Sequence, residues 1–495
     1  MTLSVNRRQL LIGSAAVACG QLLRAEPTEA APKPYGATPS ARQLRWHQLE
    51  TYAFLHVTVN TFTDKEWGYG DEDPIVFNPT AFDPDAIMRD LKAGGMKAVI
   101  LTCKHHDGFC LWPTKTTEHC IRNSKWRDGK GDVVGGIAAA AKRAGLPFGV
   151  YVSPWDRSNA AYGTPAYLKL YREQVRELLT SYGPIFEVWF DGANGGDGYY
   201  GGAREKRTID KAHYYEWPTT FAMIRQLQPE AVIFCPDGDL RWVGNEKGIA
   251  GDTCWATFGV PSSANQDVHA SDGGTREELM TGVRNGPFWR PAECDVSIRP
   301  GWFWHESENA QGKTPEQLVD LYFESVGRGA SLLLNVPPNR SGLLQDSDAQ
   351  SLAAFRRRLD AMFALDLALG AKLKASNMRG RFGVRNLVDQ NPETYWATED
   401  RVRSAEVMVD LGAQQHVSIV RLREAIALGQ RVRAFGLDAW QDGAWMQIAG
   451  GTSVGACRLI RLENPTLTSR LRLRIVESDA SIALAELSVF GTVAG

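Results

Sequence analysis

The segment Ile185-Phe186-Glu187-Val188-Trp189-Phe190-Asp191-Gly192 has the pattern of a β-strand that ends in an acidic residue and a glycine. Successive side chains of a strand point to opposite faces, so Glu187, Trp189 and Asp191 share one face. If the apolar face opposite them packs against helices, Asp191 stands at the strand end beside an indole ring. The segment therefore predicts a buried strand that ends in a carboxylate, which serves either as a reactive group or as a cap for the following turn.

Seven further strand-like runs precede or follow this segment, and helical stretches separate most of them. These runs are 53–60, 97–103, 148–154, 231–236, 253–257, 302–305 and 330–336. Helical patterns cover 85–93, 133–144, 167–179 and 315–326, and the last begins with Thr314 and Gln317 as a capping box. Strands that alternate with helices indicate a parallel sheet, and eight of them favour an α/β fold of the (β/α)8 barrel type at residues 40–346. No Gly-x-Gly-x-x-Gly motif follows the first run, which argues against a dinucleotide-binding sheet.

Helical periodicity disappears after about residue 370, where short strand-like runs separated by turn signals begin. These runs are 406–411, 417–423, 434–440, 444–448, 471–476 and 485–491. Short strands at this spacing predict an all-β antiparallel sandwich over residues 370–495. A helix rich in Arg and Leu within residues 347–369 is expected to link the sandwich to the barrel.

The first 39 residues have the features of an export signal followed by a linker. Arg7 and Arg8 precede an uncharged run that is too short to span a membrane, and a small-residue cleavage site follows near Ala25. The paired arginines resemble a twin-arginine signal. We therefore expect an exported protein, periplasmic or secreted, with no membrane span.

The charge balance and the cysteines exclude several classes of partner. The chain has 55 Lys and Arg against 57 Asp and Glu, and the net charge of −2 gives no basis for binding nucleic acid. None of the eight cysteines lies in a Cys-x-x-Cys pair, so a zinc ribbon is not expected. Their wide spacing favours buried thiols over a disulfide framework. The oligomeric state is left open by the sequence.

Histidines and a tyrosine lie where strands of the predicted barrel end, which is where barrel enzymes place their reacting groups. His56 closes the first apolar run, His105 and His106 follow the second, and Tyr151 closes the third. Imidazoles at a barrel mouth can donate hydrogen bonds to sugar hydroxyls, or they can hold a metal ion. Adjacent histidines on a strand point to opposite faces, which makes chelation of one ion by both less favourable.

Several segments together resemble the α-L-fucosidases of glycoside hydrolase family 29, over about residues 43–344. They are His56-Val57-Thr58-Val59-Asn60-Thr61-Phe62-Thr63, Glu66-Trp67, His105-His106-Asp107-Gly108-Phe109, Trp189-Phe190-Asp191-Gly192 and Leu332-Leu333-Leu334-Asn335-Val336-Pro337-Pro338. Val57 departs from the glycine that is more usual in the family. The resemblance implies a retaining fucosidase with Asp191 as nucleophile, no cofactor and no metal, acting on a fucosylated oligosaccharide or glycoprotein. The fucose pocket that it implies consists of His56, Glu66, Trp67, His105, His106, Tyr151 and Trp189.

Retention of configuration requires a second carboxyl group that donates a proton. We expect this acid/base to be Glu246, in the string Arg241-Trp242-Val243-Gly244-Asn245-Glu246. The string resembles the branch of the family that acts on α-1,3 and α-1,4 linkages, and the nearby indole would favour the protonated acid. Glu293 is the alternative.

Two other functions remain compatible with the same residues. A metal-dependent hydrolase would use His56, His105 and His106 as ligands, and loss of activity with a chelator would reveal it. A non-catalytic glycan-binding protein would bind sugar without releasing fucose.

The C-terminal part resembles a discoidin-like (coagulation-factor type C) domain over about residues 371–491. The segments that carry this resemblance are Asn386-Leu387-Val388-Asp389 and Asn391-Pro392-Glu393-Thr394-Tyr395-Trp396. Modules of this kind either bind sugars through their loops or only support a catalytic barrel, and both roles stay open here.

Overall fold

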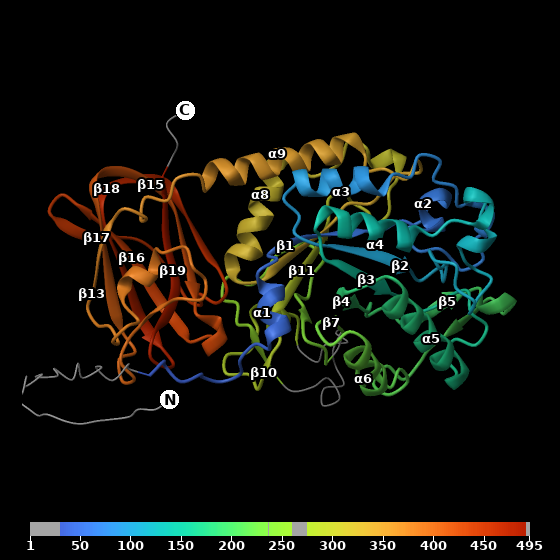
Figure 1. The fold of residues 1–495 in the computed structure, drawn as a ribbon, viewed down its shortest axis with the longest axis horizontal. Helices are drawn as coiled ribbons and strands as arrows, with labels where there is room; N and C mark the ends of the chain where they lie inside the picture. Colours follow the sequence, from blue (N-terminus) through green and yellow to red (C-terminus); the bar gives the residue numbers. More distant parts are fainter. Residues whose placement is uncertain (1–29, 236, 260–274, 492–495) are drawn as a thin grey trace, which may run out of the picture.

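The computed structural model describes residues 30–235, 237–259 and 275–491. The predicted export signal lies outside these residues. No helix in the described part is long and apolar enough to cross a membrane. The chain forms two bodies, a barrel and a β-sandwich, with the long helix α9 (Asp346–Met362) running along one side (Figure 1).

Eight parallel strands form the sheet of the first body, which confirms the predicted barrel class. They are β1 (Thr51–Leu55), β2 (Val99–Lys104), β3 (Phe148–Val152), β4 (Ile185–Trp189), β7 (Val232–Phe234), β8 (Arg241–Trp242), β11 (Ala292–Ser297) and β12 (Ser331–Asn335). Their order in the sheet is β7-β4-β3-β2-β1-β12-β11-β8. A single bridge between Phe234 and Leu240 brings the β8 side of the sheet back to β7, so the barrel is nearly closed.

Two of the eight predicted strands were wrong. Residues 302–305 form no strand, and Thr257–Phe258 (β9) pairs with Phe288–Trp289 (β10) in a separate antiparallel ribbon. The barrel instead contains β8 and β11, which the apolar pattern of the sequence does not predict. Strand β8 has only two residues, and β11 reads Ala-Glu-Cys-Asp-Val-Ser, with carboxyl groups in place of an apolar run.

The helices of the barrel are α1 (Ala41–His47), α2 (Val59–Thr63), α3 (Pro84–Ala93), α4 (Val133–Ala144), α5 (Pro165–Ser181), α6 (Trp217–Leu227), α7 (Arg276–Thr281) and α8 (Pro315–Glu324). Four of them, α3, α4, α5 and α8, agree with the predicted ranges to within a few residues, and the other four were not predicted. The predicted capping box of α8 is present, because Thr314 and the side chain of Gln317 satisfy each other's backbone N–H groups. A small hairpin, β5 (Gly196–Gly198) and β6 (Glu205–Arg207), follows β4.

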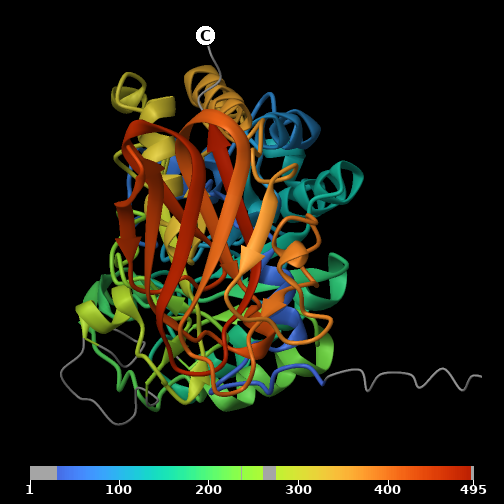
Figure 2. The same ribbon diagram turned by 90° about the vertical axis from the view of Figure 1, so that its left-hand side faces the viewer.

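The second body is an antiparallel sandwich, as predicted (Figure 2). Its strands are β13 (Lys372–Ala375), β14 (Trp396–Ala397), β15 (Ala405–Glu424), β16 (Val432–Gln441), β17 (Ala444–Gly451), β18 (Arg458–Ser478) and β19 (Ala483–Gly491). The runs predicted as two strands at 406–411 and 417–423 are parts of one long strand, β15, whose register shifts between Asp410 and Gln415.

Side chains of the sandwich hold the barrel segment 252–256, which follows β8. The amide of Gln430 accepts a hydrogen bond from the N–H of Ala256 at 2.7 Å and donates one to the carbonyl of Cys254 at 3.0 Å. Ser453 accepts from the N–H of Cys254 at 2.8 Å, and Arg458 binds the Asp252 carboxylate at 2.8 Å. These contacts fix the backbone that continues from the β8 loop.

Candidate active site

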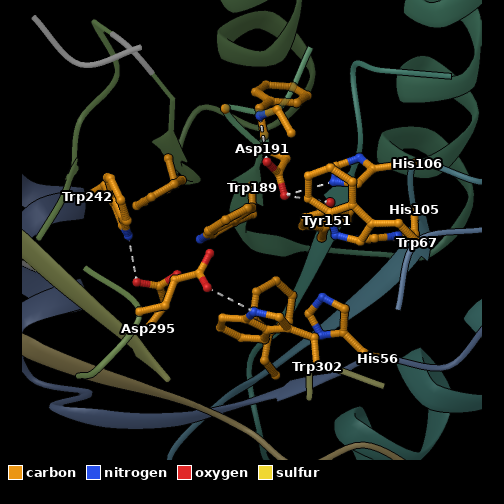
Figure 3. Close-up of a pocket in the computed structure, with 16 residues that line it drawn as sticks. His56, Trp67, His105, His106, Tyr151, Trp189, Asp191, Trp242, Asp295 and Trp302 are labelled. Atoms are coloured by element: carbon orange, nitrogen blue, oxygen red, sulfur yellow. Dashed lines mark hydrogen bonds and ion pairs between the residues drawn. The ribbon is translucent and has the colours of Figure 1, made fainter. Parts of the chain in front are cut away.

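A cavity of about 320 Å³ lies where the barrel strands end at their carboxyl termini (Figure 3). Its walls come from most of the barrel strands or the residues directly after them. They are Phe54, His56, Trp67, His105, His106, Tyr151, Trp189, Phe190, Asp191, Gly192, Ala193, Phe234, Trp242, Glu246, Asp295 and Trp302. The cavity therefore collects nearly all the residues that the sequence suggested for one site.

Asp191 lies two residues beyond β4 and uses its two carboxylate oxygens differently. Oδ1 accepts a hydrogen bond from the N–H of Ala193 at 2.7 Å, which is the turn cap that the sequence allowed. Oδ2 accepts from the Tyr151 hydroxyl at 2.8 Å and lies 3.8 Å from Nε2 of His106. One oxygen thus fixes the side chain, while the other faces the cavity and its donors.

The three histidines of the cavity are buried, and neighbouring side chains hold two of them, His56 and His106. Nδ1 of His56 lies 2.8 Å from Oδ1 of Asn335, and Nδ1 of His106 lies 2.8 Å from Oγ of Ser153. Burial lowers the pKa of both His56 and His106 to about 4, and it lowers the pKa of His105 as well. All three imidazoles are therefore neutral at pH 7, which leaves them able to exchange hydrogen bonds with hydroxyl groups.

The grouping of possible metal ligands differs from the one expected. His105, His106 and Asp191 each offer an atom, and these atoms lie within 4.8 Å of one another. His56, the third ligand in the metal-dependent hypothesis, is not part of this group. The Asp191 oxygen that faces the cavity also accepts a hydrogen bond from the Tyr151 hydroxyl. These three side chains can therefore bind sugar hydroxyls as well as an ion.

The two candidate proton donors have very different surroundings. Glu246 lines the cavity, and its Oε2 accepts a hydrogen bond from the Trp302 indole at 3.3 Å. Partial burial raises its pKa above the ordinary value, and the charges of Asp191 and Glu66 raise it further against the effect of that hydrogen bond. Glu293 is 0% exposed inside the barrel and does not line the cavity. Geometry therefore favours Glu246 as the group that can reach a substrate.

Glu66 and Trp67 act at the rim. The Glu66 carboxylate accepts from the N–H groups of Trp302 at 2.9 Å and Phe303 at 3.0 Å, and it lies 2.8 Å from Nε2 of His305. It thus orders the loop that carries Trp302 and is not itself a wall residue. Trp67 is a wall residue, 53% exposed, with its ring edge-on to His106 at 5.0 Å.

Asp295 is an acidic wall residue that the sequence did not indicate. It is 4% exposed and accepts a hydrogen bond from the Trp242 indole at 2.8 Å. Burial raises its pKa well above the ordinary value, and the charges of Glu246 and Glu293 add to the shift. The available signal was the i, i+2 pair Glu293 and Asp295, which places both side chains on one face of a strand. Apolar periodicity alone does not predict this strand, because carboxyl groups interrupt its apolar run.

A nearly closed barrel with three carboxyl groups around a cavity rich in hydroxyl-binding groups is typical of a glycoside hydrolase. Residues 36–361 match the family model described as alpha-L-fucosidase, and residues 372–487 match the F5/8 type C domain. The chain therefore belongs to the α-L-fucosidase family, glycoside hydrolase family 29, with a discoidin-like C-terminal domain.

Relatives with curated names and solved structures agree with this assignment. Alpha-L-fucosidase 1 of Arabidopsis thaliana is 40% identical over 467 residues, which cover 93% of this chain and 88% of the relative. A putative alpha-L-fucosidase structure from Bacteroides thetaiotaomicron has a TM-score of 0.85 at 37% identity, covering 93% of this chain and 99% of that one. A Ruminococcus gnavus family 29 fucosidase in complex with fucose has a TM-score of 0.83 at 32% identity, covering 94% and 97%.

Proposed function

We propose that this α-L-fucosidase is a retaining enzyme that removes terminal α-1,3- or α-1,4-linked fucose from branched oligosaccharides or glycoproteins. The observation that carries the proposal is the position of Asp191 and Glu246 around one cavity, close enough for the charge of Asp191 to raise the pKa of Glu246. A retaining glycosidase needs such a pair, one ionised and one protonated, at about 5–5.5 Å.

The proposed reaction is a double displacement. Oδ2 of Asp191 attacks the anomeric carbon while Glu246 gives its proton to the leaving glycosidic oxygen, and a fucosyl ester forms on Asp191. Glu246, now ionised, takes a proton from water, and the resulting hydroxide breaks the ester and restores Asp191. Tyr151 stabilises the Asp191 carboxylate in the resting state through its hydrogen bond at 2.8 Å.

The fucose ring in this proposal is held by the neutral imidazoles of the cavity. His56, His105 and His106 exchange hydrogen bonds with its hydroxyls, and Trp67 and Trp189 supply apolar surface for its ring and methyl group. Glu66 contributes by ordering the loop with Trp302. A relative whose solved structure is described as a complex with fucose supports this choice of sugar.

The linkage preference rests on the string at 241–246 and on the aromatic walls beside Glu246. Trp242 and Trp302 line the cavity next to the proposed proton donor, where the leaving sugar must lie. Two indoles at that end offer stacking surface to a leaving oligosaccharide, which a small aryl group would use less.

For the rest of the chain, we propose the limits 40–346 for the barrel, 347–369 for the linking helix and 370–495 for the sandwich. The sandwich is proposed to stabilise the barrel and not to bind sugar. Its contacts to residues 252–256, from Gln430, Ser453 and Arg458, favour this role. We also retain export through the signal at Arg7 and Arg8, which would place the enzyme in the periplasm or outside the cell.

The test is to incubate the purified chain with an α-1,3/1,4-fucosylated Lewis-type oligosaccharide and with 2′-fucosyllactose, following free fucose with and without EDTA. Release from the branched substrate alone, unchanged by EDTA, is the expected result. Loss of activity with EDTA would favour the metal-dependent reaction, for which the cluster of His105, His106 and Asp191 is the supporting observation. Saturable binding without release would favour a glycan-binding protein.

A further inference from the structure

Two glutamates lie inside the barrel, beside the cavity wall, and the proposed reaction uses neither of them. Glu187 of β4 and Glu293 of β11 are each 0% exposed and are not wall residues. A buried carboxylate normally pairs with a cation, because ionisation without water is costly. Within the described residues, neither carboxyl group forms an ion pair with a lysine or an arginine.

The hydrogen bonds around this pair are distributed unequally. The Tyr52 hydroxyl donates to Oε2 of Glu293, and the Trp189 indole donates to Oε1 of Glu293 at 2.7 Å. No donor lies within ordinary hydrogen-bond geometry of either oxygen of Glu187 among the described residues, although the Trp46 side chain is near enough to lower its pKa. The two carboxyl groups nevertheless lie close enough for each to shift the pKa of the other. Two ionised carboxylates buried side by side without a cation would repel each other, so this arrangement favours a proton on one of them.

Charge and burial favour one position for that proton. Burial raises the pKa of both carboxyl groups, and the charge of Glu293 raises the pKa of Glu187 further. The donors Tyr52 and Trp189 lower the pKa of Glu293, whereas Trp46 alone lowers that of Glu187, by less than burial and Glu293 raise it. Glu293 is therefore the more favourable site for the negative charge, and Glu187 for the proton.

The pair is connected to the cavity through one side chain. Trp189 donates to Glu293 at one edge, while its ring stacks on Phe234 at 4.2 Å and on Tyr151 at 5.1 Å between centroids. Tyr151 in turn donates to Asp191. In Figure 3, Trp189 lies between the Asp191 end of the cavity and the end with Trp242 and Asp295. The orientation of this indole therefore sets the shape of the cavity wall.

We propose that Glu187 and Glu293 share a single proton and act as positioning residues that hold Trp189 in the wall of the fucose pocket. Glu187 donates this proton to the Glu293 carboxylate, which also accepts from Tyr52 and Trp189. The pair thus carries one negative charge, fully bonded, with no cation. The inference rests on the proposed function only in taking the cavity as the fucose pocket.

Replacement of glutamate by glutamine is expected to have little effect at position 187 and a large effect at position 293. Glu187→Gln keeps a neutral donor beside Glu293, so kcat/KM for an aryl α-L-fucoside stays within about threefold of the wild type. Glu293→Gln leaves one acceptor oxygen for two donors, so one of Tyr52 and Trp189 must face an amide N–H group. We expect this variant to lose at least about tenfold in fucose affinity, measured by calorimetry, through a displaced Trp189.

The shared proton is tested separately, in resting protein at pH 7, by infrared spectroscopy of the protonated carboxyl band. The difference between the wild type and Glu187→Gln should contain one such band, whether or not the protein cleaves fucosides. If Glu293→Gln fails to fold, Trp189→Phe, which keeps a ring but removes the N–H group, should weaken fucose binding instead. Absence of the infrared band would overturn the inference, as would equal losses in the two glutamine variants or unchanged fucose affinity in both Glu293→Gln and Trp189→Phe.

Discussion

The two ends of the cavity are built differently. At the end with Asp191, His105 and His106, every side chain follows a barrel strand closely, and Asp191 and His106 are held by the buried partners Tyr151 and Ser153. At the other end, Glu246 stands in a loop, is partly exposed, and has a 3.3 Å hydrogen bond from Trp302 as its described partner. This difference suits a rigid site for one sugar and a more adaptable site for varied leaving groups.

The largest expected effect comes from the rigid end. Asp191→Gly removes the nucleophile, so turnover of every α-L-fucoside should fall by about 10⁴-fold or more, with partial recovery when azide is added. Thermal unfolding should remain cooperative, since the change removes a partly exposed side chain. Asp197→Asn, in the exposed hairpin after β4, is the matched control and should keep normal turnover. Normal turnover in Asp191→Gly would show that Asp191 is not the nucleophile, and that the reaction does not depend on the rigid end of the cavity.

A smaller and substrate-dependent effect is expected at the adaptable end. Glu246→Gln removes the proton donor, so turnover of an oligosaccharide should fall by about 10²–10³-fold. An aryl fucoside with a good leaving group needs less protonation and should lose less in the first step. Steady-state rates on both substrates measure the contrast. Equal losses on the two would show that Glu246 does not act on the leaving oxygen.

The neutral histidines predict a dependence of stability on pH. The pKa values of His56 and His106 are lowered from 6.5 to about 4, so folding favours the uncharged forms. Their contribution is present above pH 6.5 and is lost as the pH falls towards 4, by at most about 3 kcal/mol for each. Denaturant unfolding across this range should show a steep fall for the wild type and a shallower one for His56→Gln. His213→Gln, at an exposed position, should follow the wild type.

The smallest expected effect concerns Asp295. Asp295→Ala removes an acceptor of the Trp242 indole, so the indole would be held less firmly at the leaving-group end. We expect a three- to tenfold loss of kcat/KM on a branched oligosaccharide, about the value of one hydrogen bond, and a smaller loss on an aryl fucoside. A larger loss on the aryl substrate would place Asp295 in fucose binding instead.

The same division explains what the sequence could predict. The rigid end follows long apolar strands, so the ends of β1 to β4 and the residues His56, His105, Tyr151 and Asp191 were identifiable from periodicity and motif. The other end follows β8, with two residues, and β11, with two interior carboxyl groups. Apolar periodicity cannot identify such strands, so it does not indicate Asp295, and it predicts barrel strands at 253–257 and 302–305 instead.

The sequence also does not predict how far along a strand a side chain lies from the mouth of the barrel. Glu293 and Asp295 share one face of β11, yet Glu293 bonds to Tyr52 and Trp189 in the barrel interior while Asp295 reaches the cavity. Alternation gives the face of a side chain but not its height relative to the barrel mouth. That is why Glu293 remained an alternative acid/base on sequence grounds.

The most direct test of the account is to label the protein with a 2-deoxy-2-fluoro-α-L-fucosyl donor that has a good leaving group, and to locate the adduct by peptide mass spectrometry. The fluorine slows breakdown of the fucosyl ester, so the covalent intermediate should accumulate. If Asp191 is the nucleophile, one fucosyl group is expected on the peptide that contains Asp191, and none when free fucose protects the site. A label on another carboxyl group, or leaving-group release with no covalent adduct, would contradict this role of Asp191.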